Sequence, residues 1–315
     1  MLSVTDISAL QRWGEPHLAL RLGLPVSDPS PGVTTLDEAT NEAVLAEARL
    51  QATAERPLHI LVERPEQRIR STRVVSHVWS GPLPEGAFYQ LTPSVLLASP
   101  SFVLQQMSAR RSLAECAVIA SEICGTYARD ATVSDGFFRR PQLGTLDALR
   151  EHFASEHGYG AKRAREALRF VVDGSRSPME TVVVLLFTLP QSVGGCGLPA
   201  PRLNVRINIP VDLQEAIDKP YVVVDLCWYD QRVILEYDSY RWHTAPRAVD
   251  SDSTRNEGLR DLGWMVRSVT VGMLANDAMR RHLVSKVMAR FGRELPGGAE
   301  FDRLQGELVR ALLRA

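Results

Sequence analysis

The pattern of apolar and polar positions is clearest in the second half of the chain. Apolar residues at helical spacing predict helices over 161–172, 178–189 and 251–262, the last of which ends at Gly263. Four apolar, β-branched segments predict strands, at 205–209, 222–228, 232–238 and 264–270. The order of these segments predicts an α/β domain in which a mixed sheet is flanked by helices.

The first half of the chain has a different pattern, and we expect it to fold separately as an α+β region. Helices are expected at 36–55 and, with a break near Ser112, at 102–124, and short strands at 59–63 and 74–79. A polar stretch at 130–145 precedes the basic helix that begins at Ala161. We therefore predict an N-terminal domain at 1–157 and a C-terminal domain at 158–315.

Three acidic residues stand on the two apolar strands that flank the turn at Asp230-Gln231. A tight turn there places Asp225 directly opposite Glu236, and side chains in such a position have Cβ atoms about 5 Å apart. Asp238 lies two residues further along and therefore shares the face of Glu236. The sequence thus predicts an acidic centre on neighbouring strands.

Carboxylates set opposite each other in an apolar hairpin repel, and burying them without compensation is costly. A divalent cation between them makes the arrangement favourable, and three carboxylate ligands suit Mg²⁺ or Mn²⁺. The alternative is a half-buried ion pair between Asp225 and an arginine, either Arg255 or Arg267. The strand pattern alone leaves both interpretations open.

The acidic segment belongs to an ordered set of motifs in the C-terminal half. The set consists of Gly174-Ser-Arg-Ser-Pro-Met-Glu-Thr181, Gly197-Leu-Pro-Ala-Pro201, Val224-Asp-Leu-Cys-Trp228, Leu235-Glu-Tyr-Asp238, Arg241-Trp-His243, Asp252-Ser-Thr-Arg-Asn256 and Leu262-Gly-Trp264. It resembles the DUF559-type nuclease-like domain, which is related to the very-short-patch repair endonucleases of the PD-(D/E)XK superfamily. The N-terminal region resembles, less specifically, an antitoxin-like region that precedes such domains in actinobacterial proteins.

This resemblance implies a restriction-endonuclease-like fold with a metal site. Asp225 and Glu236 would be metal ligands, and Glu180 would add a third carboxylate from a helix. Asp238 would lie in the catalytic centre, where the superfamily motif has its lysine. His243 would lie near the site and could relay a proton.

Two further residues are nucleic-acid-binding candidates. Arg255 would lie on the helix beside the sheet and contact phosphate, and Trp242 could stack on a base. Each candidate also has a plainer interpretation. Arg255 could pair only with neighbouring acids, Trp242 could belong to the core or its rim, and His243 could be an exposed loop residue. Glu180 completes a Ser177-x-x-Glu capping box and could serve only as a helix cap.

Composition narrows the classes of partner. The net charge of −1 argues against a protein that coats nucleic acid through bulk charge. The basic segment that includes Arg165 and Arg169 would then supply local phosphate contacts, unless it is simply a solvated helix face. The four cysteines lack zinc-site spacing and are expected to be buried free thiols.

The sequence has no apolar run long enough to span a membrane and no secretion signal at its start, so we expect no membrane partner and a cytoplasmic location. The expected function is Mg²⁺-dependent endonucleolytic hydrolysis of DNA phosphodiester bonds. The alternative is a catalytically inactive nuclease fold that acts as a DNA-binding or antitoxin-like regulator. The oligomeric state is left open.

Overall fold

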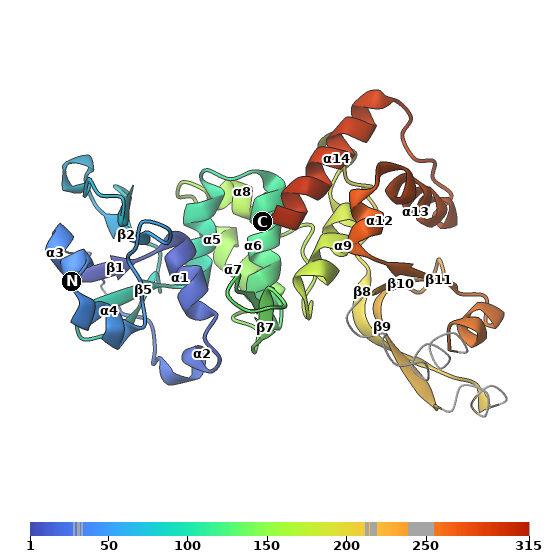
Figure 1. Ribbon diagram of the computed structural model, residues 1–315, viewed down its shortest axis with the longest axis horizontal. Helices are drawn as coiled ribbons and strands as arrows, with labels where there is room; N and C mark the ends of the chain where they lie inside the picture. Colours follow the sequence, from blue (N-terminus) through green and yellow to red (C-terminus); the bar gives the residue numbers. More distant parts are fainter. Residues whose placement is uncertain are drawn as a thin grey trace. The chain divides into compact units, whose positions relative to one another are not determined.

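The computed structural model describes residues 1–27, 29, 32, 34–211, 214, 219–238 and 255–314. The chain divides into two compact units, Met1–Arg169 and Phe170–Ala315. Both units combine helices with a sheet, which confirms the expected α/β class (Figure 1). Each unit is described by itself.

The N-terminal unit is built on a five-stranded sheet with the strand order β3-β2-β1-β5-β4. Its strands are β1 (Leu2–Val4), β2 (Leu58–Val62), β3 (Val74–Val78), β4 (Phe88–Thr92) and β5 (Val95–Ala98). The pairs β2–β3 and β1–β5 are parallel, whereas β1–β2 and β4–β5 are antiparallel. The two strands expected at 59–63 and 74–79 are thus confirmed, and they pair directly with each other.

Helices cover this sheet and extend beyond it. They are α1 (Asp6–Trp13), α2 (Leu18–Arg21), α3 (Leu36–Ala39), α4 (Glu42–Ala48), α5 (Pro100–Ser108), α6 (Leu113–Cys124), α7 (Leu146–Ser155) and α8 (Ala161–Ala167). A 3₁₀ turn lies at Pro65–Gln67, and β6 (Tyr127–Arg129) and β7 (Phe137–Arg139) form a small hairpin. The expected break near Ser112 is confirmed, because Ser112 caps α6 with a complete capping box. The helix expected at 36–55 is instead two short helices, since the Asn41 side chain caps a new helix at Ala43 and Val44.

The two units divide between Arg169 and Phe170, later than the expected boundary at 157/158. Helix α8, which the sequence placed in the C-terminal domain, contacts α5, α6 and α7 of the N-terminal unit. The reason is packing, because Ala161, Ala164 and Ala167 form a buried small-residue face on this basic helix. Basic composition therefore did not mark the start of a domain.

The C-terminal unit is built on a four-stranded mixed sheet with the strand order β11-β10-β9-β8. Its strands are β8 (Arg202–Asn208), β9 (Tyr221–Trp228), β10 (Val233–Tyr237) and β11 (Met265–Val269). Its helices include α9 (Pro178–Thr188), α12 (Val271–Ala275), α13 (Asp277–Arg290), α14 (Ala299–Arg314) and the helical residues 255–261. A 3₁₀ turn lies at Gln191–Val193. Strands β8, β9 and β10 are antiparallel, and β11 joins β10 in parallel. The expected strands are all present.

Helices lie against this sheet as the sequence pattern indicated. Helix α9, whose residues from Glu180 to Thr188 are all buried, contacts β9 and β10. Leu259, from the helical residues 255–261, joins a buried cluster that includes Val224, Ile234 and Val266. All four cysteines are buried free thiols, as expected.

A hydrogen-bond pair explains how α8 is held in the N-terminal unit and gives a test. Arg165 donates from Nη1 to the backbone oxygen of Phe153, at 2.8 Å, and to that of Glu156. We expect Arg165→Ala to lower the free energy of unfolding by about 1–3 kcal/mol, because two carbonyls lose a charged donor. Chemical denaturation monitored by circular dichroism measures this. The control is Arg169→Ala, which removes an exposed side chain and should stay within about 0.5 kcal/mol of wild type.

Candidate functional site

The hairpin of β9 and β10 has the register that the sequence predicted. Trp228, Cys227 and Leu226 pair with Val233, Ile234 and Leu235, respectively. The regular backbone pairing of β9 with β10 ends there, because the N–H of Tyr237 donates to a side chain instead of to a backbone oxygen. The N–H of Tyr237 donates to Oδ2 of Asp225, at 2.8 Å. Asp225 is therefore fixed by β10 itself.

Glu180 lies at the start of α9 and is buried. Its N–H donates to Oγ of Ser177, at 3.2 Å, so the expected helix cap is present. Its carboxylate accepts hydrogen bonds from the N–H of Arg176 (2.9 Å), Oγ of Ser177 (3.2 Å) and Nδ2 of Asn204 (3.3 Å). Ser177 therefore caps α9, but the reciprocal bond expected of a capping box comes from the N–H of Arg176 rather than from that of Ser177. Asn204 also connects this carboxylate to the sheet.

The negative charge of Asp225 is close enough to Glu180 to affect the pKa of the Glu180 carboxyl. Burial raises the pKa of the Glu180 carboxyl, and the negative charge of Asp225 raises it further, against the lowering effect of the hydrogen bonds. Burial also raises the pKa of the Asp225 carboxyl, opposed by the Tyr237 N–H and by the charges of Arg255 and Arg176. In the described part of the chain, no cationic side chain forms an ion pair with either carboxylate.

Glu236 has a different environment from its two acidic neighbours. Arg255 binds its carboxylate through both terminal nitrogens, with Nη1 at 2.9 Å from Oε2 and Nη2 on Oε1. Nη2 also donates to the backbone oxygen of Val223, at 3.1 Å. The arginine-pair alternative therefore applies to Glu236 rather than to Asp225. The expected repulsion across the hairpin is relieved by a cation that the chain itself supplies.

The acidic residues are not gathered into a closed ligand set. Asp238 follows β10, where its N–H donates to the backbone oxygen of Val269, at 2.9 Å. Across the ranges that the structure describes, one group of three His, Cys, Asp or Glu side chains has its ligand atoms within 4.8 Å of one another, and it does not include Asp225, Glu236 or Glu180. A metal bound by all three carboxylates would thus require a rearrangement.

That one group consists of Asp6, His59 and His77 in the N-terminal unit, and it could hold a metal ion. The sequence reasoning missed it, because the three residues are far apart in the chain and have no motif spacing. The available signal was the presence of one histidine on each of the two short strands at 59–63 and 74–79. Only the parallel pairing of β2 with β3 brings these histidines together.

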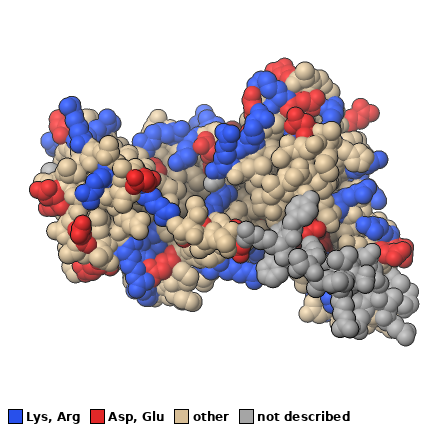
Figure 2. All heavy atoms as spheres, in the orientation of Figure 1, with Lys and Arg blue, Asp and Glu red and all other residues tan. Residues whose placement is uncertain are grey.

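The remaining sequence candidates fall in different places. His243 and Trp242 lie outside the described residues. Arg165 and Arg169 belong to the N-terminal unit, and the Arg165 guanidinium is used in hydrogen bonds to two backbone oxygens. On the face drawn in Figure 2, basic side chains are interspersed with acidic ones. The Arg165 guanidinium is thus occupied by the protein's own backbone, whereas the Arg169 side chain is exposed.

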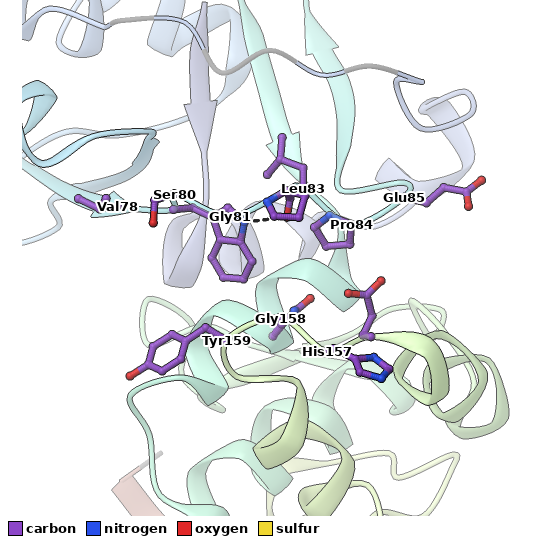
Figure 3. Close-up of a pocket in the computed structure, with 13 residues that line it drawn as sticks. Val78, Ser80, Gly81, Leu83, Pro84, Glu85, His157, Gly158 and Tyr159 are labelled. Carbon is purple, nitrogen blue, oxygen red and sulfur yellow. Dashed lines mark hydrogen bonds between the residues drawn. The ribbon is translucent and has the colours of Figure 1, made fainter.

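The N-terminal unit also contains a pocket of about 470 Å³ (Figure 3). The segment that follows β3, from Ser80 to Glu85, faces His157, Gly158 and Tyr159 across it. Gln105 lines the pocket and is fully buried. Its Nε2 lies so close to Gly158 that a Cβ added there would be 2.7 Å away, so a larger residue at 158 would displace the Gln105 amide.

Comparison with known proteins identifies two similar chains of Mycobacterium tuberculosis. They are the uncharacterized protein MT2308 of strain CDC 1551 / Oshkosh and the uncharacterized protein Rv2248 of strain ATCC 25618 / H37Rv. Each is 31% identical to this chain over 170 residues, which make up 50% of this chain and 56% of the relative. The chain thus spans about half the length of the curated relatives it matches.

No family model matches the sequence, and no solved structure matches it either. Of the helices in the described ranges, none combines the length and the apolar character that crossing a membrane requires.

The Arg255–Glu236 pair predicts that Glu236→Gln destabilises the protein. Both side chains are largely buried, with exposed fractions of 15% and 20%, so a neutral amide leaves the guanidinium under-compensated. We expect a loss of about 1–3 kcal/mol in the free energy of unfolding, measured by urea denaturation in EDTA. The exposed Glu257, on the same helix, provides the control Glu257→Gln. Equal stability of the two variants would contradict a structural role for the pair.

The raised pKa values of Asp225 and Glu180 predict that ionisation of these two carboxyls lowers the stability of the folded protein. Each protonated form is favoured in the folded state, so this contribution to stability is present at low pH and is lost as pH rises through the folded-state pKa. Asp225→Asn keeps an oxygen to accept the Tyr237 N–H but removes the charge. Its stability relative to wild type should therefore increase as pH rises above about 4, the unfolded-state value of an aspartate. Parallel pH profiles from urea denaturation would refute this electrostatic account.

Proposed function

We propose that the C-terminal unit is a metal-dependent nuclease module that hydrolyses phosphodiester bonds of DNA. The observation that carries the proposal is the pair of carboxylates formed by buried Glu180 and half-buried Asp225. Each has a raised pKa, and within the described ranges neither has an ion-pair partner. Such an arrangement is unfavourable by itself and becomes favourable when a cation binds.

The donor chemistry and the fold both support this assignment. Carboxylate oxygens are the ligands that Mg²⁺ and Mn²⁺ prefer, so Glu180 and Asp225 fit such an ion. A mixed sheet flanked by helices, with Glu180 at the start of α9 and Asp225 on β9, is also what the resemblance to DUF559-type domains implies. When bound, the ion would polarise a phosphoryl oxygen and lower the pKa of a bound water.

The chain's own residues orient the acidic groups. The N–H of Tyr237 holds Asp225, while Arg176, Ser177 and Asn204 hold Glu180. Hydrogen bonds to these oxygens leave each carboxylate with further lone pairs, since an ionised carboxylate accepts several bonds. Both ligands would therefore be preoriented before an ion arrives, which reduces the entropy lost on binding.

Arg255 would couple the site to its substrate. Its guanidinium suits a phosphate as well as a carboxylate, because both accept two parallel hydrogen bonds. A DNA phosphate that takes over Arg255 would release Glu236, which would then become available as a third metal ligand. Proton relay by His243 and base stacking by Trp242 remain predictions of the resemblance.

A second candidate function is a DNA-binding or antitoxin-like regulator that keeps the fold without hydrolysis. The specific observation in its favour is the Arg255–Glu236 pair, which neutralises one of the three expected metal ligands. Asp238 also stands where the superfamily motif has a lysine, so the usual positive charge near the attacking water is missing. In both cases we propose DNA as the partner and the cytoplasm as the compartment.

Cleavage assays test the nuclease proposal and separate it from the regulator. The full chain is incubated with plasmid DNA, single-stranded DNA and RNA in Mg²⁺, Mn²⁺ or EDTA. We expect metal-dependent cleavage of DNA and a loss of at least about 100-fold in Asp225→Asn, since a ligand charge is removed from the reaction centre. The control Glu257→Gln, on an exposed position, should cleave as wild type does.

Failure of the assay is informative about the alternative. Salt-sensitive DNA binding without cleavage in either metal would favour the regulator. Cleavage that persists in EDTA, or that is unchanged in Asp225→Asn, would refute the proposed metal site.

A further inference from the structure

The geometry points to a second metal site, in the N-terminal unit, where Asp6, His59 and His77 would bind a divalent transition-metal ion of the Zn²⁺ type. This inference does not rest on the proposed nuclease function. It uses other residues, in the other compact unit of the chain.

The sheet places the two histidines on one face. In the parallel pair of β2 and β3, Leu61 is the partner of His77, and His59 lies two residues before Leu61. Residues two apart on a strand share a face, so both imidazoles extend to the same side. Their rings are stacked, with centroids 5.0 Å apart and an interplanar angle of 27°.

Asp6 reaches the same place from the end of β1. The N–H of the preceding residue, Thr5, donates to the backbone oxygen of His59, at 3.0 Å, which fixes the chain there. Asp6 then adopts the left-handed region, with φ of 51°, a conformation that Asp tolerates better than most residues other than glycine.

The three donor groups are close enough for one ion. Nδ1 of His59 lies 2.8 Å from Nε2 of His77, and the Asp6 oxygens lie 3.6 Å and 3.8 Å from these two nitrogens. Ligands of a tetrahedral ion with bonds of about 2.0–2.1 Å stand about 3.3 Å apart. The spacing of the donor atoms is therefore within a few tenths of an ångström of what one ion requires.

The donor set selects the class of metal. Two imidazole nitrogens and one carboxylate suit Zn²⁺, Co²⁺ or Ni²⁺, whereas Mg²⁺ prefers oxygen ligands alone. All three side chains are largely shielded, with exposed fractions of 7% for Asp6, 17% for His59 and 10% for His77.

Arg110 competes with a metal for this cluster. Its Nη2 lies 2.5 Å from Nδ1 of His77 and 3.4 Å from Oδ2 of Asp6. A guanidinium only donates, so Nδ1 of His77 accepts and the proton of this ring sits on Nε2. Metal binding at Nε2 requires the other tautomer, in which Nδ1 carries the proton and repels the guanidinium.

Arg110 is able to leave. Its side chain is 52% exposed, unlike the three groups that it covers, so it can turn into solvent without a rearrangement of the sheet. Arg110 would thus act as an internal substitute for the ion, and its removal should strengthen metal binding. A cluster that is merely a structural hydrogen-bond network predicts no such gain.

Zinc titration of the EDTA-treated full chain, followed by competition with a chromophoric chelator, tests the site. We expect the wild-type protein to bind one Zn²⁺ per chain. The variants His77→Gln and Asp6→Asn should lose this binding. Zinc should be retained in His157→Gln, which alters an exposed histidine, and in Asp225→Asn, which alters the acidic site of the other unit. Co²⁺ in place of Zn²⁺ should give visible absorption bands of a low-symmetry site that contains nitrogen ligands.

The variant Arg110→Met provides a second test, which does not require the variants at His77 and Asp6 to fold. It should tighten Zn²⁺ binding by at least about tenfold, the ratio that corresponds to one charge-assisted hydrogen bond. The proposal is overturned if wild type binds no Zn²⁺, if His77→Gln binds it as wild type does, or if Arg110→Met leaves the affinity unchanged. None of these results bears on DNA cleavage by the C-terminal unit.

Discussion

The ion pair between Arg255 and Glu236 is the interaction on which the charge balance of the C-terminal sheet depends. It joins the helical residues 255–261 to β10, and its additional hydrogen bond to Val223 joins the same helix to β9. Leu259, on the same helix, belongs to the buried cluster that includes Val224 and Ile234, so the ion pair and the core both hold this helix on the sheet. Because one arginine satisfies one carboxylate, Asp225 and Glu180 are left to repel each other.

Glu180 illustrates how one side chain serves packing and charge at once. Its hydrogen bonds with Arg176 and Ser177 close the start of α9, as a capping residue does. The hydrogen bond from Asn204 and the field of Asp225 tie the same carboxylate to the sheet. The cap and the ligand interpretations are therefore compatible, since an ionised carboxylate has acceptor sites for both.

In both units an arginine side chain contacts a largely shielded acidic side chain. In each, this arginine contacts a side chain that is proposed as a metal ligand: Arg255 binds Glu236, and Arg110 lies between Asp6 and His77. The two arginines differ in exposure, at 15% and 52%, respectively. The more exposed one costs less to displace, because its charge is already partly solvated. The N-terminal cluster is thus the more accessible of the two to an incoming ion.

The sequence by itself determined the four strands of the C-terminal sheet, strands β2 and β3 of the N-terminal sheet, the register of the β9–β10 hairpin, the break near Ser112 and the cap at Ser177, because these depend on local periodicity and turn chemistry. It also identified the three carboxylates of the acidic centre. The tertiary structure decided which of them Arg255 neutralises, since their separation in space depends on how a helix packs on the sheet. It alone decided the Asp6–His59–His77 cluster, because parallel pairing of strands separated along the chain leaves no periodic signal in the sequence.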